Sequence, residues 1–192
     1  MNFTTAITRR SLTAAVSLTA AFMLHTAPAG AAEGAGQCPG ALDVPTSQAQ
    51  LDTAADAVIC LVNAERTSRG LNALKRDGDL AQAARGHTRD MVANHYFEHT
   101  SPNGASVGDR IRQAGYGKPG DGWKVGENLG WGTGERATPN ALVDAWLNSD
   151  GHKKNMLAGA YRELGVGVAI GAPKASTALP GATYTLNLGV IR

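Results

Sequence analysis

Three polar side chains, His99, Glu127 and His152, have the chemistry of a metal site or of an acid–base site. Glu127 lies among glycines and apolar residues in the stretch "GENLG", so its carboxylate is a candidate for partial burial and would need a partner there. Imidazole and carboxylate groups are ligands that zinc accepts. Separations of 28 and 25 residues imply no local geometry. The alternative is that the three are ordinary surface or capping residues.

A second chemistry is suggested by Gly104, Ser106 and Gly108, which spell the G-x-S-x-G pattern of a serine nucleophile. Asp144 or Asp150, followed by His152, would complete the chain order of a hydrolase triad. A nucleophile elbow needs a strand before its first glycine, whereas "HTSPNG" has turn chemistry. The competing interpretation of Ser106 is the N-cap of a helix. A serine esterase is therefore kept only as an alternative function.

Two other histidines have structural interpretations. His87 falls on the apolar stripe of a predicted helix, which favours a hydrogen-bonded core histidine. His95 and His99 are four residues apart and could share a helix face as metal ligands. However, the turn cluster that follows Phe97 predicts that the helix ends there. We therefore expect His95 to be a solvated residue at the helix terminus.

Residues 1–32 have the order of a secretory signal peptide. Arg9 and Arg10 precede an apolar run of 14 residues, which is followed by a stretch of small residues. The run is shorter than the ~20 residues of a membrane-spanning helix, which is the alternative. The paired arginines leave open whether export follows the general or the twin-arginine route. The sequence predicts a secreted protein with no membrane span in its mature part.

The mature chain is close to neutral, since the whole chain has 18 Lys and Arg against 16 Asp and Glu and the signal segment holds two arginines. This balance argues against a nucleic-acid partner, which is usually met by a basic surface. The two cysteines, Cys38 and Cys60, are predicted to form a disulfide because the chain is exported. About 160 residues suit one domain, expected over 51–192 after an extended lead-in over 33–50.

The elements that would position these residues follow the order α-α-α-β-α-β-β. Helices are expected from Asp52 to Gly70, from about Asp79, over 106–115, and after Thr138 and Pro139; strands are expected over 126–135, 163–171 and 182–191. Strands and helices do not alternate regularly, so an α+β domain is favoured over a doubly wound sheet.

Four segments resemble the bacterial branch of the CAP superfamily, which groups cysteine-rich secretory, antigen 5 and pathogenesis-related 1 proteins. They are the stretch from "CLVNAERTSRGLNAL" to "HYFEHTSPNG", then "GENLGWG", "ALVDAWLNSDGHKKNML" and "ELGVGVA". They occur in the family's order, and the resemblance runs from about Leu51 to Val190. It implies an α-β-α sandwich, with a small, mainly antiparallel sheet between helices and a central cleft.

The resemblance also implies a ligand-binding cleft of two histidines and two acidic residues. His99, Glu127 and His152 match three of these positions, and Ser149 stands where the second acidic residue is expected. Several family members bind a divalent metal in this cleft, so His99, His152 and Glu127 become the candidate metal ligands, with zinc as the expected ion. The missing carboxylate weakens the expected affinity.

The function implied by the resemblance is binding, of a metal or of a small-molecule, lipid or cell-envelope ligand. The alternative within the same cleft is a hydrolase, with His99 or His152 as general base and Glu127 as the residue that orients it. The fold does not decide between an enzyme and a binding protein.

Overall fold

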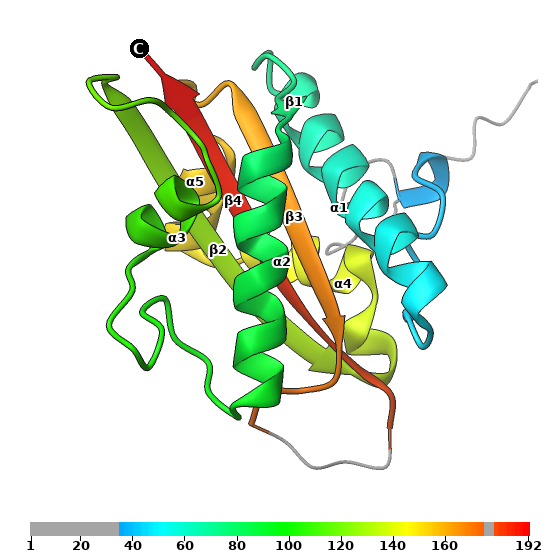
Figure 1. Cartoon of the computed structure of the whole chain (residues 1–192). Helices are drawn as coiled ribbons and strands as arrows, with labels where there is room; N and C mark the ends of the chain where they lie inside the picture. Colours follow the sequence, from blue (N-terminus) through cyan, green and yellow to red (C-terminus); the bar gives the residue numbers. More distant parts are fainter. Residues whose placement is uncertain (1–34, 175–178) are drawn as a thin grey trace, which may run out of the picture.

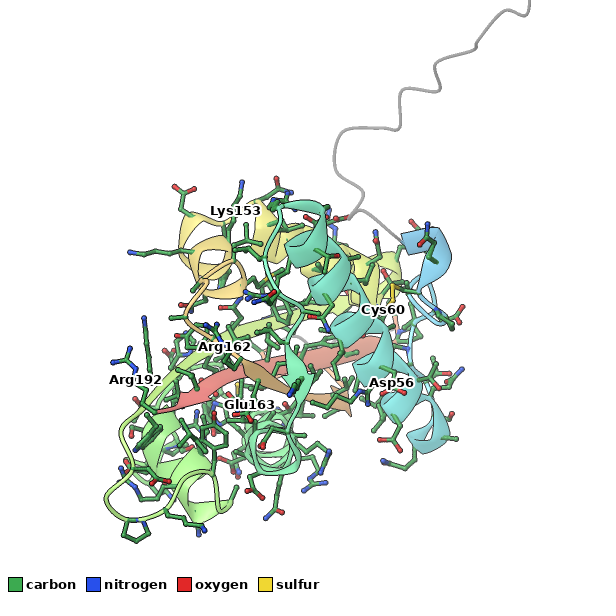
Figure 2. The ribbon with its side chains drawn as sticks, turned by 90° about the horizontal axis from the view of Figure 1, so that it is seen from above. Asp56, Cys60, Lys153, Arg162, Glu163 and Arg192 are labelled. Atoms are coloured by element: carbon green, nitrogen blue, oxygen red, sulfur yellow. A yellow bond between two sulfur atoms is a disulfide. The ribbon has the colours of Figure 1, made fainter. Side chains whose placement is uncertain are left out.

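The computed structural model describes residues 35–174 and 179–192, and the predicted signal peptide lies outside these residues. Figure 1 shows a sheet with α2 across one face and α1 and α4 on the other side. The view from above in Figure 2 separates the helices α4 and α5, drawn in yellow, from the green helices α2 and α3. The expected α+β class and the layered arrangement are confirmed.

The described helices are α1 (Gln48–Ser68), α2 (Gly78–Ala93), α3 (Val107–Gln113), α4 (Pro139–Leu147) and α5 (Asp150–Met156), with 3-10 turns η1 (Ala35–Gln37) and η2 (Gly134–Ala137). The apolar spacing explains α1, whose buried residues include Ala54, Val58, Leu61 and Val62. In α4, Thr138 caps the helix by accepting a hydrogen bond from the backbone of Ala141, and Pro139 occupies the first turn.

Four strands form one mixed sheet: β1 (Lys75–Arg76), β2 (Trp123–Thr133), β3 (Glu163–Ile170) and β4 (Gly181–Ile191). Their order across the sheet is β1-β3-β4-β2. Strand β4 pairs antiparallel with both β2 and β3, and β1 pairs parallel with β3. The central β4 is buried from Gly181 to Gly189, which fits a strand covered on both faces. The longest strand at an edge is β2.

Two glycines of β3 let α2 approach the sheet closely. A Cβ atom on Gly165 would lie 2.0 Å from the backbone nitrogen of Ala81, and one on Gly167 would lie 2.3 Å from the carbonyl carbon of Ala84. Side chains at these positions would therefore push the helix away. On the opposite face, Leu164, Val166 and Val168 join the main core with residues of α1 and α4.

A disulfide joins Cys38 to Cys60 of α1, as predicted. It ties the segment before α1 to the helix and borders the main core. Figure 2 shows Cys60 on the side of α1 that faces this segment. Among the described residues, no helix is long and apolar enough to cross a membrane.

The structure corrects four expectations about the elements. Helix α1 begins at Gln48, inside the segment expected to be an extended lead-in. Strand β1 was not predicted, because two exposed basic residues give no strand pattern. Strand β2 begins at Trp123, before the expected start. Helix α5 was also missed because it is short and polar, so His152 lies near the start of a helix rather than at a helix end.

Candidate functional site

The outer edge of β2 carries the candidate site. Successive side chains of a strand point to opposite faces of the sheet, so the neighbouring side chains of Glu127 and Asn128 lie on different faces. Glu127 turns toward α3, where it meets Arg110. Asn128 turns toward α5, where its amide nitrogen donates to the carbonyl of His152 at 3.0 Å. The two halves of the site therefore lie on opposite faces of one edge strand.

Glu127 is held by two partners. Its side chain is 1% exposed. Arg110 Nη2 donates to Oε2 at 2.8 Å and to Oε1 at 3.1 Å. His99 Nδ1 lies 2.9 Å from Oε1. The predicted burial of this carboxylate in contact with a partner is confirmed, and the partner is an arginine as well as a histidine.

His99 is oriented by Glu127. Because a carboxylate only accepts, Nδ1 carries the proton and donates, which leaves Nε2 as the free ring nitrogen in the neutral form. The hydrogen bond to Glu127 raises the pKa of His99 above its ordinary value, although partial burial opposes the shift. The His99 side chain is 55% exposed, so solvent and ligands can reach the ring.

His152 is oriented in a different way. Its Nδ1 lies 2.9 Å from the hydroxyl oxygen of Ser149, the N-cap residue of the same helix. A hydroxyl can donate or accept, so either tautomer of the ring is compatible with this contact. Burial lowers the pKa of His152, and the nearby charge of His99 lowers it further.

Arg110 also holds the loop that carries His99. Its Nη1 donates to the carbonyl of His99 at 2.9 Å and to the carbonyl of Ala105 at 3.0 Å. The helix that presents Arg110 is started by Ser106, whose hydroxyl accepts from the backbone of Asp109 and donates to its carboxylate. Ser106 therefore caps α3, as its N-cap interpretation predicts. The serine of the G-x-S-x-G pattern is thus the residue that starts α3.

His87 occupies a separate buried position behind this loop. It is 1% exposed, and its Nε2 donates to the carbonyl of Glu98 at 3.0 Å. The hydroxyls of Tyr96 and Ser101 lie 3.3 Å and 3.4 Å from Nδ1. Burial lowers the pKa of His87 and favours the neutral ring. The prediction of a hydrogen-bonded core histidine is confirmed. His95 is exposed directly after α2, also as predicted.

The donor atoms decide how a divalent metal fits here. Both oxygens of Glu127 are already engaged by Arg110 and His99, so this carboxylate is suited to orienting a ligand rather than to binding the ion directly. Within residues 35–174 and 179–192, no group of three or more His, Cys, Asp or Glu side chains is arranged to hold a metal. Two imidazoles remain, and neutral imidazole suits zinc and its neighbours. The imidazoles of His99 and His152 are thus the candidate donors at this site.

Sequence reasoning missed three residues of the site. The sequence does not mark Arg110 as a site residue, because nothing in its short helix indicates an ion pair with Glu127, 17 residues downstream. Asn128 and Asn155 were also missed. The Asn155 amide nitrogen donates to the carbonyl of Glu127 at 3.3 Å and to the side-chain oxygen of Asn128 at 3.1 Å. These amides join α5 to β2 and so fix the position of His152.

Residues 60–185 match the model of the CAP family, described as the cysteine-rich secretory protein family. The matched segment contains His99, Arg110, Glu127 and His152. The chain belongs to this family. The resemblance inferred from the motifs is thereby confirmed for this CAP protein.

Two Bacillus subtilis proteins are similar to this CAP protein. The uncharacterized protein YkwD is 38% identical over 110 residues, which are 57% of this chain and 40% of that protein. The uncharacterized membrane protein YlbC is 36% identical over 116 residues, 60% of this chain and 32% of that protein. The alignments thus span less than half of either relative.

Solved structures agree on the fold of the CAP domain. An extracellular protein from Bacillus anthracis that contains an SCP domain matches with a TM-score of 0.59 and 30% identity, over 77% of this chain and 44% of that one. An outer surface protein of Borrelia burgdorferi matches with a TM-score of 0.56 and 20% identity, over 70% of this chain and 90% of that one. The second match supports the fold alone.

Proposed function

We propose that this protein is secreted and that His99 and His152 together bind a divalent metal ion reversibly, with zinc preferred. The observation that carries the proposal is that each ring is oriented through Nδ1, by Glu127 and by Ser149, at 2.9 Å in both cases. Each Nε2 is then the ring nitrogen available to a ligand. Orientation of this kind is what the outer partners of metal-binding histidines provide.

The chemistry of the proposed site follows from its donors. Two imidazoles with an outer carboxylate leave open positions, at which a bound ion would take an oxygen donor from water or from a small or cell-envelope ligand. Ser149 is a poorer donor than the carboxylate of other family members, so we expect moderate affinity. Histidine must be neutral to bind metal. Because the pKa of His99 is raised, protons compete for this ring at higher pH than for an ordinary histidine.

Secretion is supported by two observations. A disulfide between Cys38 and Cys60 is typical of oxidising compartments outside the cytosol. The similar Bacillus anthracis protein is described as extracellular. The predicted signal peptide fits the same interpretation. A tagged full-length chain should be recovered from the medium or the envelope without its first ~32 residues, and recovery of the intact chain from the cytosol would contradict secretion.

The metal proposal is tested by calorimetric titration of the protein with zinc chloride. The His99→Ala, His152→Ala double variant should lose most of the binding heat. His95→Asn is the matched control, because His95 is exposed and lies outside the site. Its titration should equal that of the parent. Binding by the double variant as tight as by the parent would reject a shared two-histidine site.

A second variant tests the role of Ser149. Ser149→Glu restores an acidic group beside His152 and should tighten zinc binding if this position faces the ion. Unchanged affinity would mean that Ser149 only orients the ring.

A hydrolase is the second candidate function. The observation in its favour is the His99–Glu127 contact, since a carboxylate on Nδ1 orients an imidazole whose Nε2 can act as general base. Among the described side chains, no serine or cysteine is hydrogen-bonded to His99, so the base would act on water. Hydrolysis of p-nitrophenyl acetate by the parent, lost in His99→Gln and kept in His95→Asn, would favour this function.

A further inference from the structure

The edge of the sheet opposite the candidate site is only partly covered by β1. Strand β1 pairs with two residues of β3, with Lys75 beside Glu163 and Arg76 beside Leu164. The chain then leaves the sheet and enters α2. From Gly165 to Ile170, β3 has no neighbouring strand on this side among the residues that the structure describes. At about 3.3 Å per residue, this open edge is about 20 Å long.

The backbone groups on this edge can be identified from the hydrogen bonds at its start. The carbonyl of Leu164 accepts from the backbone of Asp77 at 2.9 Å, so it points away from β4. Alternation along a strand directs the N–H and C=O groups of Val166, Val168 and Ile170 to the same side. None of these groups has a partner in the described part of the chain. Unpaired edge groups are a template for another strand.

A groove runs along this edge, and the exposure of its residues rises from 2% at Val166 and 5% at Val168 to 42% at Ile170. Helices α1 and α2 flank β3, as Figure 1 shows, and a cavity of about 280 Å³ lies between them. Its lining is mostly apolar and includes Leu51, Ala55, Val92, Val166, Val168 and Ile170. A smaller hollow of about 80 Å³ continues toward β1 and shares Ala55 and Val166 with the first. The two hollows follow the line that a longer β1 would take.

The charges on the groove's rim differ between its two sides. Arg85 and Arg89 lie one turn apart on α2, are exposed, and form no ion pair with any described residue. The α1 side carries Asp52 near the cavity and Asp56 farther along, and Asp56 is paired with Arg76 at 2.6 Å. Figure 2 shows Asp56 on α1. The α2 side therefore favours an acidic group on the occupant.

We propose that an extended peptide segment of a partner protein adds a strand to the edge of β3, with apolar side chains in the groove and an acidic side chain at Arg85 and Arg89. A peptide satisfies the unpaired amides and carbonyls, which an acyl chain cannot do. Direct pairing of two β3 edges in a dimer is disfavoured, because each β3 is flanked by the same two helices.

Hydrogen exchange at single residues tests the free edge and its occupation. In the free protein, the amides of Val166 and Val168 should exchange faster than those of Gly165 and Gly167, which face β4. The probe is a pool of acetylated heptapeptides that alternate Val, Ile or Leu with Asp, Glu, Ser or Thr. At about 1 mM, the pool should slow exchange at Val166 and Val168 by at least tenfold, which corresponds to a dissociation constant of about 0.1 mM or lower. No protection by the pool would overturn the proposal.

Two controls separate strand addition from other kinds of binding. A pool N-methylated at alternate amides keeps its side chains but cannot form the ladder, so it should give no protection. Arg85→Glu, Arg89→Glu should weaken binding of the unmodified pool at least tenfold, whereas Arg162→Glu, at an exposed position just before β3, should not. Equal binding of the methylated pool, or no effect of the charge reversal, would overturn the proposal.

Two further outcomes would assign the groove to another occupant and also overturn the proposal. One is binding of laurate that leaves the amides of Val166 and Val168 unprotected, which would indicate an acyl-chain site. The other is protection of these amides that rises with protein concentration alone, together with a dimer in sedimentation velocity, which would indicate self-association.

Discussion

Arg110 lies against Glu127, with Nη2 2.8 Å from Oε2 and 3.1 Å from Oε1 of a carboxylate that is almost fully buried. The same guanidinium holds the carbonyl of His99, so one side chain fixes both the acid and the loop beside it. Arg110→Ala would leave a buried charge without its main partner and should lower the free energy of unfolding by about 3 kcal/mol. Urea denaturation measures this loss. Arg85→Ala, at an exposed position, should change it by less than about 0.5 kcal/mol.

The pKa of His99 should lie above the ordinary histidine value, because its Nδ1 donates to Glu127. A raised pKa in the folded state means that this pair stabilises the protein fully below about pH 6.5 and that the contribution is lost as the pH rises through the raised pKa. The stability difference between the parent and His99→Gln should accordingly be larger at pH 5.5 than at pH 8.5. Titration by NMR measures the pKa of His99 directly, and a value at or below about 6.5 would contradict the assignment.

His87 should show the opposite behaviour, since burial lowers its pKa. Here the unfolded chain binds the proton more readily, so stability is full above about pH 6.5 and falls as the pH drops toward the lowered pKa. His87→Leu removes the donor to the carbonyl of Glu98 and should cost about 2 kcal/mol at pH 7.5. It should also flatten the acid side of the stability profile. An unchanged profile in this variant would exclude His87 as the source of the dependence.

Gly167 should be intolerant of a side chain. A Cβ there would lie 2.3 Å and 2.4 Å from backbone atoms of Ala84 and Arg85, which cannot move aside without displacing α2. Gly167→Ala should therefore destabilise the protein by about 3 kcal/mol. Gly86→Ala is the matched control, because Gly86 lies within α2 with nothing within 4 Å of the added carbon. It should be neutral or stabilise by up to about 1 kcal/mol. Equal melting temperatures for the two variants would refute the close-approach argument.

The disulfide between Cys38 and Cys60 should contribute about 3 kcal/mol, because it closes a loop of moderate length in the unfolded chain. The Cys38→Ser, Cys60→Ser variant should unfold at a lower temperature, and the parent in reducing agent should approach it. Intact mass after alkylation without reduction checks the bridge. Two alkylated thiols in the exported protein would show that it does not form there.

The sequence predicted the elements that carry strong local signals. Thr138 and Pro139 predicted the start of α4, and the apolar stripe that includes His87 predicted α2. Glu127 could be expected to be buried from its apolar and glycine neighbours. Arg110 could not be predicted as its partner, because the contact depends on how α3 packs beside β2. Likewise, β1 exists through its pairing with β3 and has no pattern of its own.

The neighbouring positions of Glu127 and Asn128, on opposite sides of one strand, make this region sensitive to chain length. A single residue inserted or deleted in β2 before Glu127 would exchange the two side chains, so the amide would face Arg110 and the carboxylate would face α5. Point substitutions at odd and even positions of β2 would instead alter the His99 half and the His152 half separately. Insertion or deletion of a single residue in this strand should thus be far more damaging than a substitution. Variant libraries of this domain should therefore vary the two faces of β2 independently.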